Sequence, residues 1–253
     1  MINPLTREVR IQCNSVSLTS DLTVPQGATT VVILAHASGS SRQSSLNKYL
    51  AERLNRSGFA SLSIDLLTLQ EEREEHLTRQ FRFDIGLLAE RLGSAVEYVA
   101  GDALSKDMAI GLFAEGTGSA AALTCAANKK DKIAAIVSRG GRPDLASKAL
   151  PSVICPTLFI VGGFDPQVLI LNEKALHEMR CHREIEIVPG ARHLFDEVGK
   201  LDLVADMATW WFARHSDLRR SPQLNPSRLF DAVAPVHRKQ AGRLDSSGQH
   251  NFA

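Results

Sequence analysis

The feature that most constrains the fold is a continuous apolar and β-branched run, TVVILA, at residues 30–35. A strand that is apolar on both faces must be covered on both faces, as in a parallel sheet with helices on either side. Strand-like runs alternate with segments of helical period as far as residue 215. This alternation predicts an α/β fold on a mostly parallel central sheet of about eight strands, with helices on both faces.

The other elements follow from the spacing of apolar residues. Residues 9–24 alternate apolar and polar positions around a polar turn, which predicts an antiparallel N-terminal hairpin. Short apolar runs predict further strands at residues 59–65, 108–113, 133–137, 157–161 and 184–188. Helical spacing predicts helices from Leu46 to before Gly58 and over residues 85–99, 117–128, 166–179 and 201–215.

The connection at residues 66–82 is charged. Its run EEREE at residues 71–75 is most simply a solvated loop or the start of a helix, although its place beside a strand end permits the role of a lid. No segment is long enough for a large cap domain, so we expect a small, open pocket and small acyl substrates.

Composition excludes several classes of protein. The 29 basic and 28 acidic residues leave a net charge of +1, and 44% of residues are apolar. This balance is ordinary for a globular protein and disfavours a nucleic-acid partner. There is no apolar stretch of membrane-spanning length and no signal-peptide core at the N-terminus, so we expect a cytoplasmic protein without a membrane partner.

The composition changes after residue 215. Residues 216–253 hold six Lys or Arg against three Asp or Glu and few large apolar residues. We expect residues 1–215 to form one domain and residues 216–253 a mostly disordered polar tail, with at most one short helix from Asn225 to before Pro235.

The four cysteines, Cys13, Cys125, Cys155 and Cys181, form no C-x-x-C pair and have no His at metal-ligand spacing. We expect reduced thiols, several of them buried, and neither a disulfide framework nor a zinc site. The sequence calls for no cofactor.

Chemistry in an open α/β sheet is expected just after the carboxyl ends of the strands. Four turns stand at such ends, at residues 36–42, 114–118, 162–165 and 189–193. In chain order they supply a glycine-rich strand-to-helix turn, then an Asp, then a His. The α/β-hydrolases place nucleophile, acid and base in that order.

These turns resemble those of a known family, the dienelactone-hydrolase-like branch of the α/β-hydrolases, which includes members found beside or fused to phosphoribosyltransferase domains. The resemblance covers roughly residues 8–214 and implies an α/β-hydrolase fold that hydrolyses small carboxylic esters or lactones. Seven segments carry it in the family's order: LAHASGSSR (34–42), IDLLT (64–68), FDIGLLAERL (83–92), IGLFAEGTGSAAAL (110–123), VSRGGRPDLA (137–146), LFIVGGFDPQV (158–168) and PGARHLF (189–195).

The resemblance assigns a role to each turn. It implies that Asp165 is the acid, which fixes and stabilises the imidazole, and that His193 is the base, which takes a proton from the nucleophile. It implies oxyanion donors in the backbone N–H of Thr117 and in that of Ala37 or Ser38. It also makes the turn after residues 108–113 the nucleophile elbow.

At the apex of that elbow the chain departs from the family. Where the family pattern has G-x-S-x-G, or Cys for Ser, this chain has Ala114-Glu115-Gly116-Thr117-Gly118. The nucleophile position is therefore Gly116, which fits the strained turn but has no side chain to attack with. The sequence predicts activity that is lost, weak or removed by substitution, and it does not tell whether Gly116 is natural or introduced.

Other residues near the elbow could in principle replace the nucleophile. Thr117 and Ser119 lie in the first helical turn, and Cys125 lies two turns into the helix, so their side chains are expected to point away from the apex. The candidates for substrate binding are His36, Glu115 and Arg139. We expect His36 to brace the oxyanion loop through hydrogen bonds, and residues 139–142 to form either an anion-binding rim or, preferably, a solvated turn.

Less specific interpretations remain open. Asp165 before Pro166 could be only a helix cap, and His193 only a surface loop residue. The segment 116–121 also satisfies G-x-G-x-x-[GA], with Arg139 after the next strand, so a dinucleotide-binding protein is a minor alternative. The main rival is a pseudoenzyme that binds a small molecule without turnover. A homo-oligomer or a phosphoribosyltransferase-type neighbour are further expectations.

Overall fold

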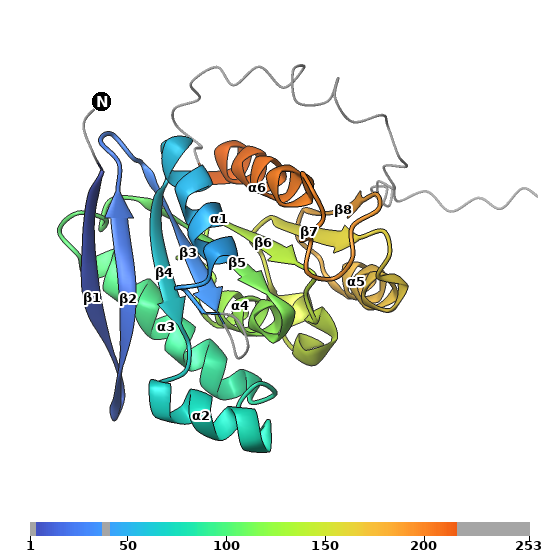
Figure 1. Cartoon of the computed structure of the whole chain (residues 1–253), viewed down its shortest axis with the longest axis horizontal. Helices are drawn as coiled ribbons and strands as arrows, with labels where there is room; N and C mark the ends of the chain where they lie inside the picture. Colours follow the sequence, from blue (N-terminus) through green and yellow to red (C-terminus); the bar gives the residue numbers. More distant parts are fainter. Residues whose placement is uncertain (1–3, 37–40, 217–253) are drawn as a thin grey trace, which may run out of the picture.

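The computed structural model describes residues 4–36 and 41–216. It contains one eight-stranded sheet in the order β1-β2-β4-β3-β5-β6-β7-β8 (Figure 1). The predicted oxyanion residues Ala37 and Ser38, and the predicted tail and short helix after residue 216, lie outside the described residues.

The predicted strands and the five predicted helices are found in the predicted order, and one further α-helix and two short 3-10 helices are additional. The strands are β1 (Leu5–Cys13), β2 (Val16–Val24), β3 (Thr30–His36), β4 (Ala60–Asp65), β5 (Ala109–Glu115), β6 (Ala135–Arg139), β7 (Thr157–Gly162) and β8 (Arg183–Val188). The α-helices are α1 (Ser45–Arg56), α2 (Leu69–Thr78), α3 (Ile85–Gly101), α4 (Gly116–Asn128), α5 (Pro166–Glu178) and α6 (Lys200–Ser216), and two short 3-10 helices follow β6, at Pro143–Ala146 and Leu150–Ser152.

The sheet is mixed at one edge and parallel elsewhere. The hairpin of β1 and β2 is antiparallel and pairs with β4, whereas β4, β3, β5, β6, β7 and β8 run parallel. The run predicted as a central strand is β3, every residue of which is buried. The predicted fold class is therefore confirmed.

Two hydrophobic layers hold the helices on the sheet. Helices α1 and α6 cover one face, and α3, α4 and α5 cover the other (Figure 1). Alternate residues of each strand face opposite layers, as the pleat requires. In β3, for example, Leu34 packs under α1 and α6, whereas Ile33 packs under α3 and α4. On α6, Trp211 is fully buried and Trp210 is partly buried against the same layer.

The segment predicted as a charged connection, with residues 71–75 as a solvated loop or the start of a helix, contains helix α2, so the helical alternative is the one found (Figure 1). Thr68 and Glu71 form a capping box, which satisfies two backbone N–H groups at the start of the helix. Glu71 also forms an ion pair with the buried Arg91 of α3 at 2.6 Å. Helix α2 is therefore held against α3 by charge pairing and not by an apolar face.

Glu75 belongs to the run predicted as solvated, but its side chain is fully buried. Its carboxylate accepts a hydrogen bond from the backbone N–H of Phe81 at 2.7 Å and forms an ion pair with Arg82. Burial by itself raises the pKa of Glu75. The hydrogen bonds and the charge of Arg82 outweigh this effect, so the net pKa lies below its usual value. The carboxylate ties the end of α2 to the loop before α3.

We predict that Glu75→Ala lowers the free energy of unfolding by about 2 to 3 kcal/mol, because it leaves buried hydrogen-bond donors unpaired. Urea denaturation at pH 7 measures the loss. In the matched control Glu74→Ala, one residue earlier in the same helix, we expect a change within about 0.5 kcal/mol. Since the pKa of Glu75 is lowered on folding, its contribution shrinks as the pH falls through that pKa. Equal losses in both variants would contradict the assignment.

Candidate active site

The predicted tight bend lies where β5 meets α4. Strand β5 ends at Glu115 and α4 begins at Gly116, with no residue between them. Gly116 has a φ of +53°, in the left-handed region that glycine adopts without the steric cost of a Cβ atom. The chain therefore forms the elbow geometry with a glycine at its apex.

The main chain of the apex is anchored by a hydrogen bond, whereas the position of a side chain at the apex is open. The carbonyl oxygen of Gly116 accepts a hydrogen bond from the backbone N–H of Arg142 at 2.9 Å. A Cβ atom built on Gly116 has no atom of the described residues within 4 Å. A Cβ atom at the apex would therefore contact none of the described residues.

Asp165 and His193 are brought together. The two lie in the turns after β7 and β8, and His193 Nδ1 is 2.7 Å from Asp165 Oδ2. The other carboxylate oxygen of Asp165 accepts from the backbone N–H of Val168 at 3.4 Å and caps α5. The two interpretations of Asp165, helix cap and imidazole partner, are thus both present in one side chain.

Backbone hydrogen bonds lock the two turns to each other. The N–H of Gly163 donates to Val188 and the N–H of Phe164 donates to Ala191, both at 2.9 Å. A Cβ on Gly162 would lie 2.5 Å from the carbonyl oxygen of Ala191, so only glycine permits this approach. The distance between Asp165 and His193 is therefore set by backbone packing.

Strand register brings His193 close to the apex. Glu115 of β5 pairs with Arg139 of β6, so Gly116 and Gly140 follow at neighbouring strand ends, about 4.8 Å apart in an ideal sheet. A Cβ on Gly140 would lie 3.5 Å from Nδ1 of His193. The imidazole ring thus packs on the loop beside the apex.

Asn172 supports that loop, and the sequence analysis did not identify it. This fully buried side chain of α5 donates through Nδ2 to the carbonyl oxygen of Gly141 at 3.0 Å. The same loop is joined to β7 by the N–H of Gly140, which donates to Ile160 at 2.8 Å. The available signal was an Asn among apolar residues of a predicted helix, in the run VLILN at residues 168–172.

The three candidates for substrate binding lie in one row at the carboxyl edge of the sheet, with His36 and Arg139 buried and Glu115 partly buried. His36, Glu115 and Arg139 end the neighbouring strands β3, β5 and β6, on the side covered by α1 and α6. Arg139 is 5% exposed, forms an ion pair with Glu115, and its guanidinium lies 5.8 Å from the ring centroid of Phe195. The prediction of a solvated turn is therefore wrong for Arg139.

Burial governs the charge of this row. It lowers the pKa of Arg139 to about 10, which leaves the guanidinium charged at pH 7. Burial, together with the charges of Arg139 and Arg42, lowers the pKa of His36 to about 3, so this imidazole is neutral. Within residues 4–36 and 41–216, neither ring nitrogen of His36 has a hydrogen-bond partner. The oxyanion loop that His36 is predicted to brace lies at residues 37–40, outside the described residues.

Both ends of the predicted oxyanion loop are fixed to the end of β4. The carbonyl oxygen of His36 accepts from the N–H of Leu66 at 2.9 Å, and the N–H of Arg42 donates to Asp65 Oδ1 at 2.7 Å. Thr117, the other predicted donor, is the second residue of α4, where the backbone N–H has no acceptor within the helix.

Two of the three alternative nucleophiles, Ser119 and Cys125, are unsuited to attack. Ser119 is fully buried, and its hydroxyl donates to the carbonyl oxygen of Ala114 at 3.2 Å. Cys125 is 2% exposed, and burial raises the pKa of its thiol to about 12, so it is not a thiolate at neutral pH. All four cysteines are free thiols, three of them buried, as predicted.

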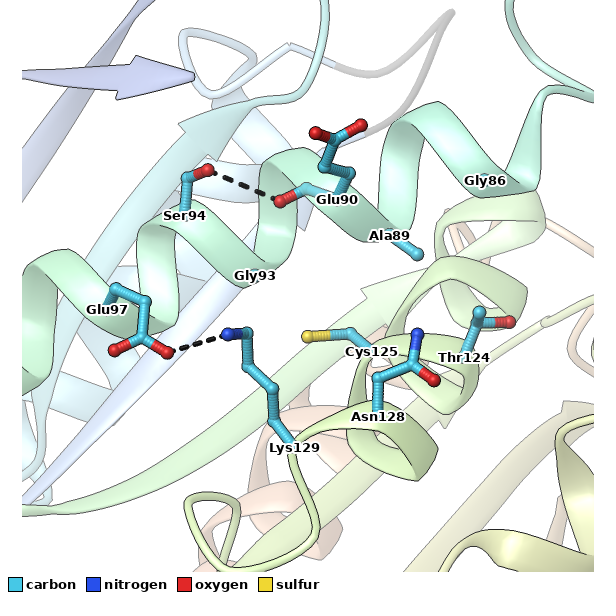
Figure 2. A pocket seen from close by; sticks show the side chains of 10 residues that line it. All are labelled: Gly86, Ala89, Glu90, Gly93, Ser94, Glu97, Thr124, Cys125, Asn128 and Lys129. Atoms are coloured by element: carbon cyan, nitrogen blue, oxygen red, sulfur yellow. Dashed lines mark hydrogen bonds and ion pairs between the residues drawn. The ribbon is translucent and has the colours of Figure 1, made fainter. Parts of the chain in front are cut away.

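A separate hollow of about 350 Å³ lies between α3 and α4 (Figure 2). Small side chains at the helix contact leave this space, and an ion pair between Lys129 and Glu97 at 2.6 Å closes one end. Its lining includes none of Gly116, Asp165 and His193.

Over residues 4–36 and 41–216, no helix is both long and apolar enough to cross a membrane. Over the same ranges, no three His, Cys, Asp or Glu side chains form a group that could hold a metal ion.

Comparison with known proteins identifies similar chains. The model of the Dienelactone hydrolase family matches residues 19–210. The crystal structure of a dienelactone hydrolase from Anabaena variabilis is 45% identical, with a TM-score of 0.83 over 85% of this chain and 100% of that one. A dienelactone hydrolase-like promiscuous phosphotriesterase from metagenomic libraries, 14% identical over 85% of this chain and 100% of that one with a TM-score of 0.71, shares the fold.

Longer proteins match as well. Two curated Mycobacterium tuberculosis proteins, both named as phosphoribosyl transferases, are 45% identical over 208 residues. The match covers 82% of this chain and 46% of theirs, so this chain spans about half the length of these relatives.

We predict that Gly140→Ala weakens the hydrogen bond between His193 and Asp165, because the new Cβ would lie 3.3 Å from the carbonyl oxygen of His193. The far-downfield proton resonance of the imidazole Nδ1–H should shift or broaden. Gly27→Ala is the matched control, since Gly27 also has a positive φ but has no atom within 4 Å of its Cβ position. Both variants should lose about 1 to 2 kcal/mol of stability, but only Gly140→Ala should alter the resonance.

We also predict that Glu115→Ala destabilises the fold by about 3 to 5 kcal/mol, because it leaves the buried Arg139 without its counter-ion. Thermal and urea unfolding measure the loss. The double variant Glu115→Ala, Arg139→Met should recover much of it, since no buried charge remains. Additive losses in the double variant would show that the ion pair is not the source of the effect.

Proposed function

Because this chain belongs to the dienelactone hydrolase family, we propose that it binds small carboxylic esters or lactones between Gly116, Asp165 and His193. The observation that carries the proposal is the 2.7 Å hydrogen bond between His193 Nδ1 and Asp165 Oδ2, on turns that adjoin an open elbow apex. The short helix α2 and the half-exposed side chain of His193 suit small substrates in an open site.

The glycine at the apex determines which chemistry is available. An acyl-enzyme needs a hydroxyl or thiol at position 116, and this chain has neither. Water must therefore attack the ester carbonyl directly. His193 Nε2 would take the proton of that water, since Nδ1 faces Asp165, and the carboxylate would stabilise the imidazolium. The N–H of Thr117 would donate to the oxyanion.

The expected rate is low. Loss of the nucleophile from a serine triad costs about 10⁶-fold in turnover, while the remaining groups retain about 10³ to 10⁴-fold over water. The second candidate function is binding without turnover. The absence of a side chain at Gly116 favours it, because no nucleophile is present. The names and the length of the curated relatives favour a phosphoribosyltransferase-type domain as a neighbour of this one.

We predict that Gly116→Ser raises the hydrolysis of p-nitrophenyl acetate by at least about 10²-fold, because it returns a nucleophile to an assembled base and acid. Gly116→Ala is the matched control, since it adds the same Cβ and backbone strain without the hydroxyl. In the Gly116→Ser background, His193→Ala and Asp165→Asn should each remove the gain. A folded Gly116→Ser protein with an intact imidazole resonance and no gain would refute the proposal.

The unmodified chain distinguishes the two functions. Weak esterase activity that His193→Ala abolishes would support attack by water. If no activity is found and γ-butyrolactone in excess raises the Tm, the chain is a binding protein, because a ligand of the native state stabilises it.

A further inference from the structure

Phe195, two residues after His193, has a backbone conformation that its residue type does not favour. Its φ is +57°, in the left-handed region where a bulky side chain is strained. Among the described residues, the other two with a Cβ atom and a positive φ are Asn14, a residue type that tolerates this region, and Arg79, the C-cap of α2. Neither reason applies to Phe195, so contacts of its side chain have to hold the strained turn.

The strained residue closes the turn that presents the imidazole. The N–H of Phe195 donates to the carbonyl oxygen of Arg192 at 3.3 Å. This hydrogen bond closes a β-turn with His193 and Leu194 as its two central residues. The direction in which His193 leaves the backbone therefore depends on where Phe195 is anchored.

The anchor is the ring of Phe195, which is fully buried in the layer under α1 and α6. The guanidinium of Arg139 lies 5.8 Å from the ring centroid, within the range of a cation–π interaction. Arg139 also forms an ion pair with Glu115, the residue before the elbow apex. Through these two contacts, the ring of Phe195 is joined to the end of β5, next to Gly116.

Two consecutive residues at the end of β6 contact the two ends of this turn. Arg139 lies against the ring of Phe195. A Cβ on Gly140 would lie 3.5 Å from both Cε1 and Nδ1 of His193, so the imidazole packs on this glycine. Because Arg139 and Gly140 are neighbours in the chain, a shift of the Phe195 ring away from Arg139 would also displace the imidazole from Gly140.

We propose that Phe195 and Arg139 are positioning residues, which hold the imidazole of His193 beside the elbow apex through a buried cation–π contact. This inference rests on the proposed function, in which His193 is the base. The two residues act through the turn at residues 192–195 and do not have to touch the substrate. A phenylalanine that only fills the core would require neither a positive φ nor a cation against its ring.

The test is the nuclear Overhauser effect (NOE) between Hε1 of His193 and the Hα protons of Gly140 in the full chain, measured together with the Nδ1–H resonance. Phe195→Leu keeps an apolar side chain but removes the ring that the guanidinium contacts. We expect this NOE to fall several-fold and the Nδ1–H resonance to broaden. Phe212→Leu is the matched control, since Phe212 is fully buried in the same layer, and it should leave both signals unchanged.

A second set of variants tests the contact from the side of the cation. The double variant Glu115→Ala, Arg139→Met removes both charges together, and we expect the same loss of the NOE as in Phe195→Leu. Adding Phe195→Leu to it should cause little further loss, because the contact is already absent. Thermal unfolding confirms that each variant is folded. A folded Phe195→Leu chain with the NOE intact overturns the inference, as does an equal effect of Phe195→Leu with and without Arg139.

Kinetics in the Gly116→Ser background distinguish positioning from contact with the substrate. We expect Phe195→Leu to lower kcat for p-nitrophenyl acetate by about 10- to 100-fold and to keep KM within about twofold, because a displaced base slows the chemical step. A raised KM with an unchanged kcat would mean that Phe195 contacts the substrate, and the positioning role would be wrong.

The two proposals fail in different ways. If the NOE depends on Phe195 and Arg139 but Gly116→Ser gains no activity, the proposed function is wrong and the positioning of the imidazole stands. If Gly116→Ser is active and Phe195→Leu alters neither the NOE nor kcat, the positioning role is wrong and the proposed function stands.

Discussion

The shared carboxyl edge of the parallel strands is the constraint on which the candidate site depends. Register places Gly116 beside Gly140 and the turn after β7 beside the turn after β8, although these segments are far apart in sequence. At such separations a Cβ atom is often too large, as it is at Gly162, where it would lie 2.5 Å from Ala191 O. Close backbone approach, not side-chain flexibility, fixes the position of the imidazole.

A glycine at the elbow separates geometry from chemistry. The bend requires a positive φ, which costs any L-residue with a Cβ about 1 to 2 kcal/mol and costs glycine little. Gly116 therefore relieves strain at the very position where a hydroxyl would be needed. A well-formed elbow is consequently no evidence of turnover in this chain. Under the proposed function, the attacking oxygen therefore has to come from a second molecule, such as water.

The sequence predicted the parts of the structure that local pattern controls. The buried strand β3 and the order of elbow, Asp165 and His193 follow from residues near one another in sequence. The sequence left helix α2 open as an alternative to a loop and did not give its extent, because its exposed Leu69 and Leu77 give no apolar stripe and a capping box and ion pairs hold it instead. The burial of Arg139 was missed because its counter-ion, Glu115, lies on the neighbouring strand.

Asp165 and His193 differ in whether a structural role explains the residue at that position. Asp165 has a structural role, since one of its carboxylate oxygens caps α5. Asp is a favoured N-cap residue whether or not catalysis occurs. His193 has no such role in its side chain, which is 51% exposed and whose hydrogen bond is to the second oxygen of Asp165. A half-exposed imidazole that is oriented through Nδ1 contributes little to stability. The backbone turns thus fix where His193 lies, and the proposed function gives a reason for the orientation of its imidazole toward Asp165.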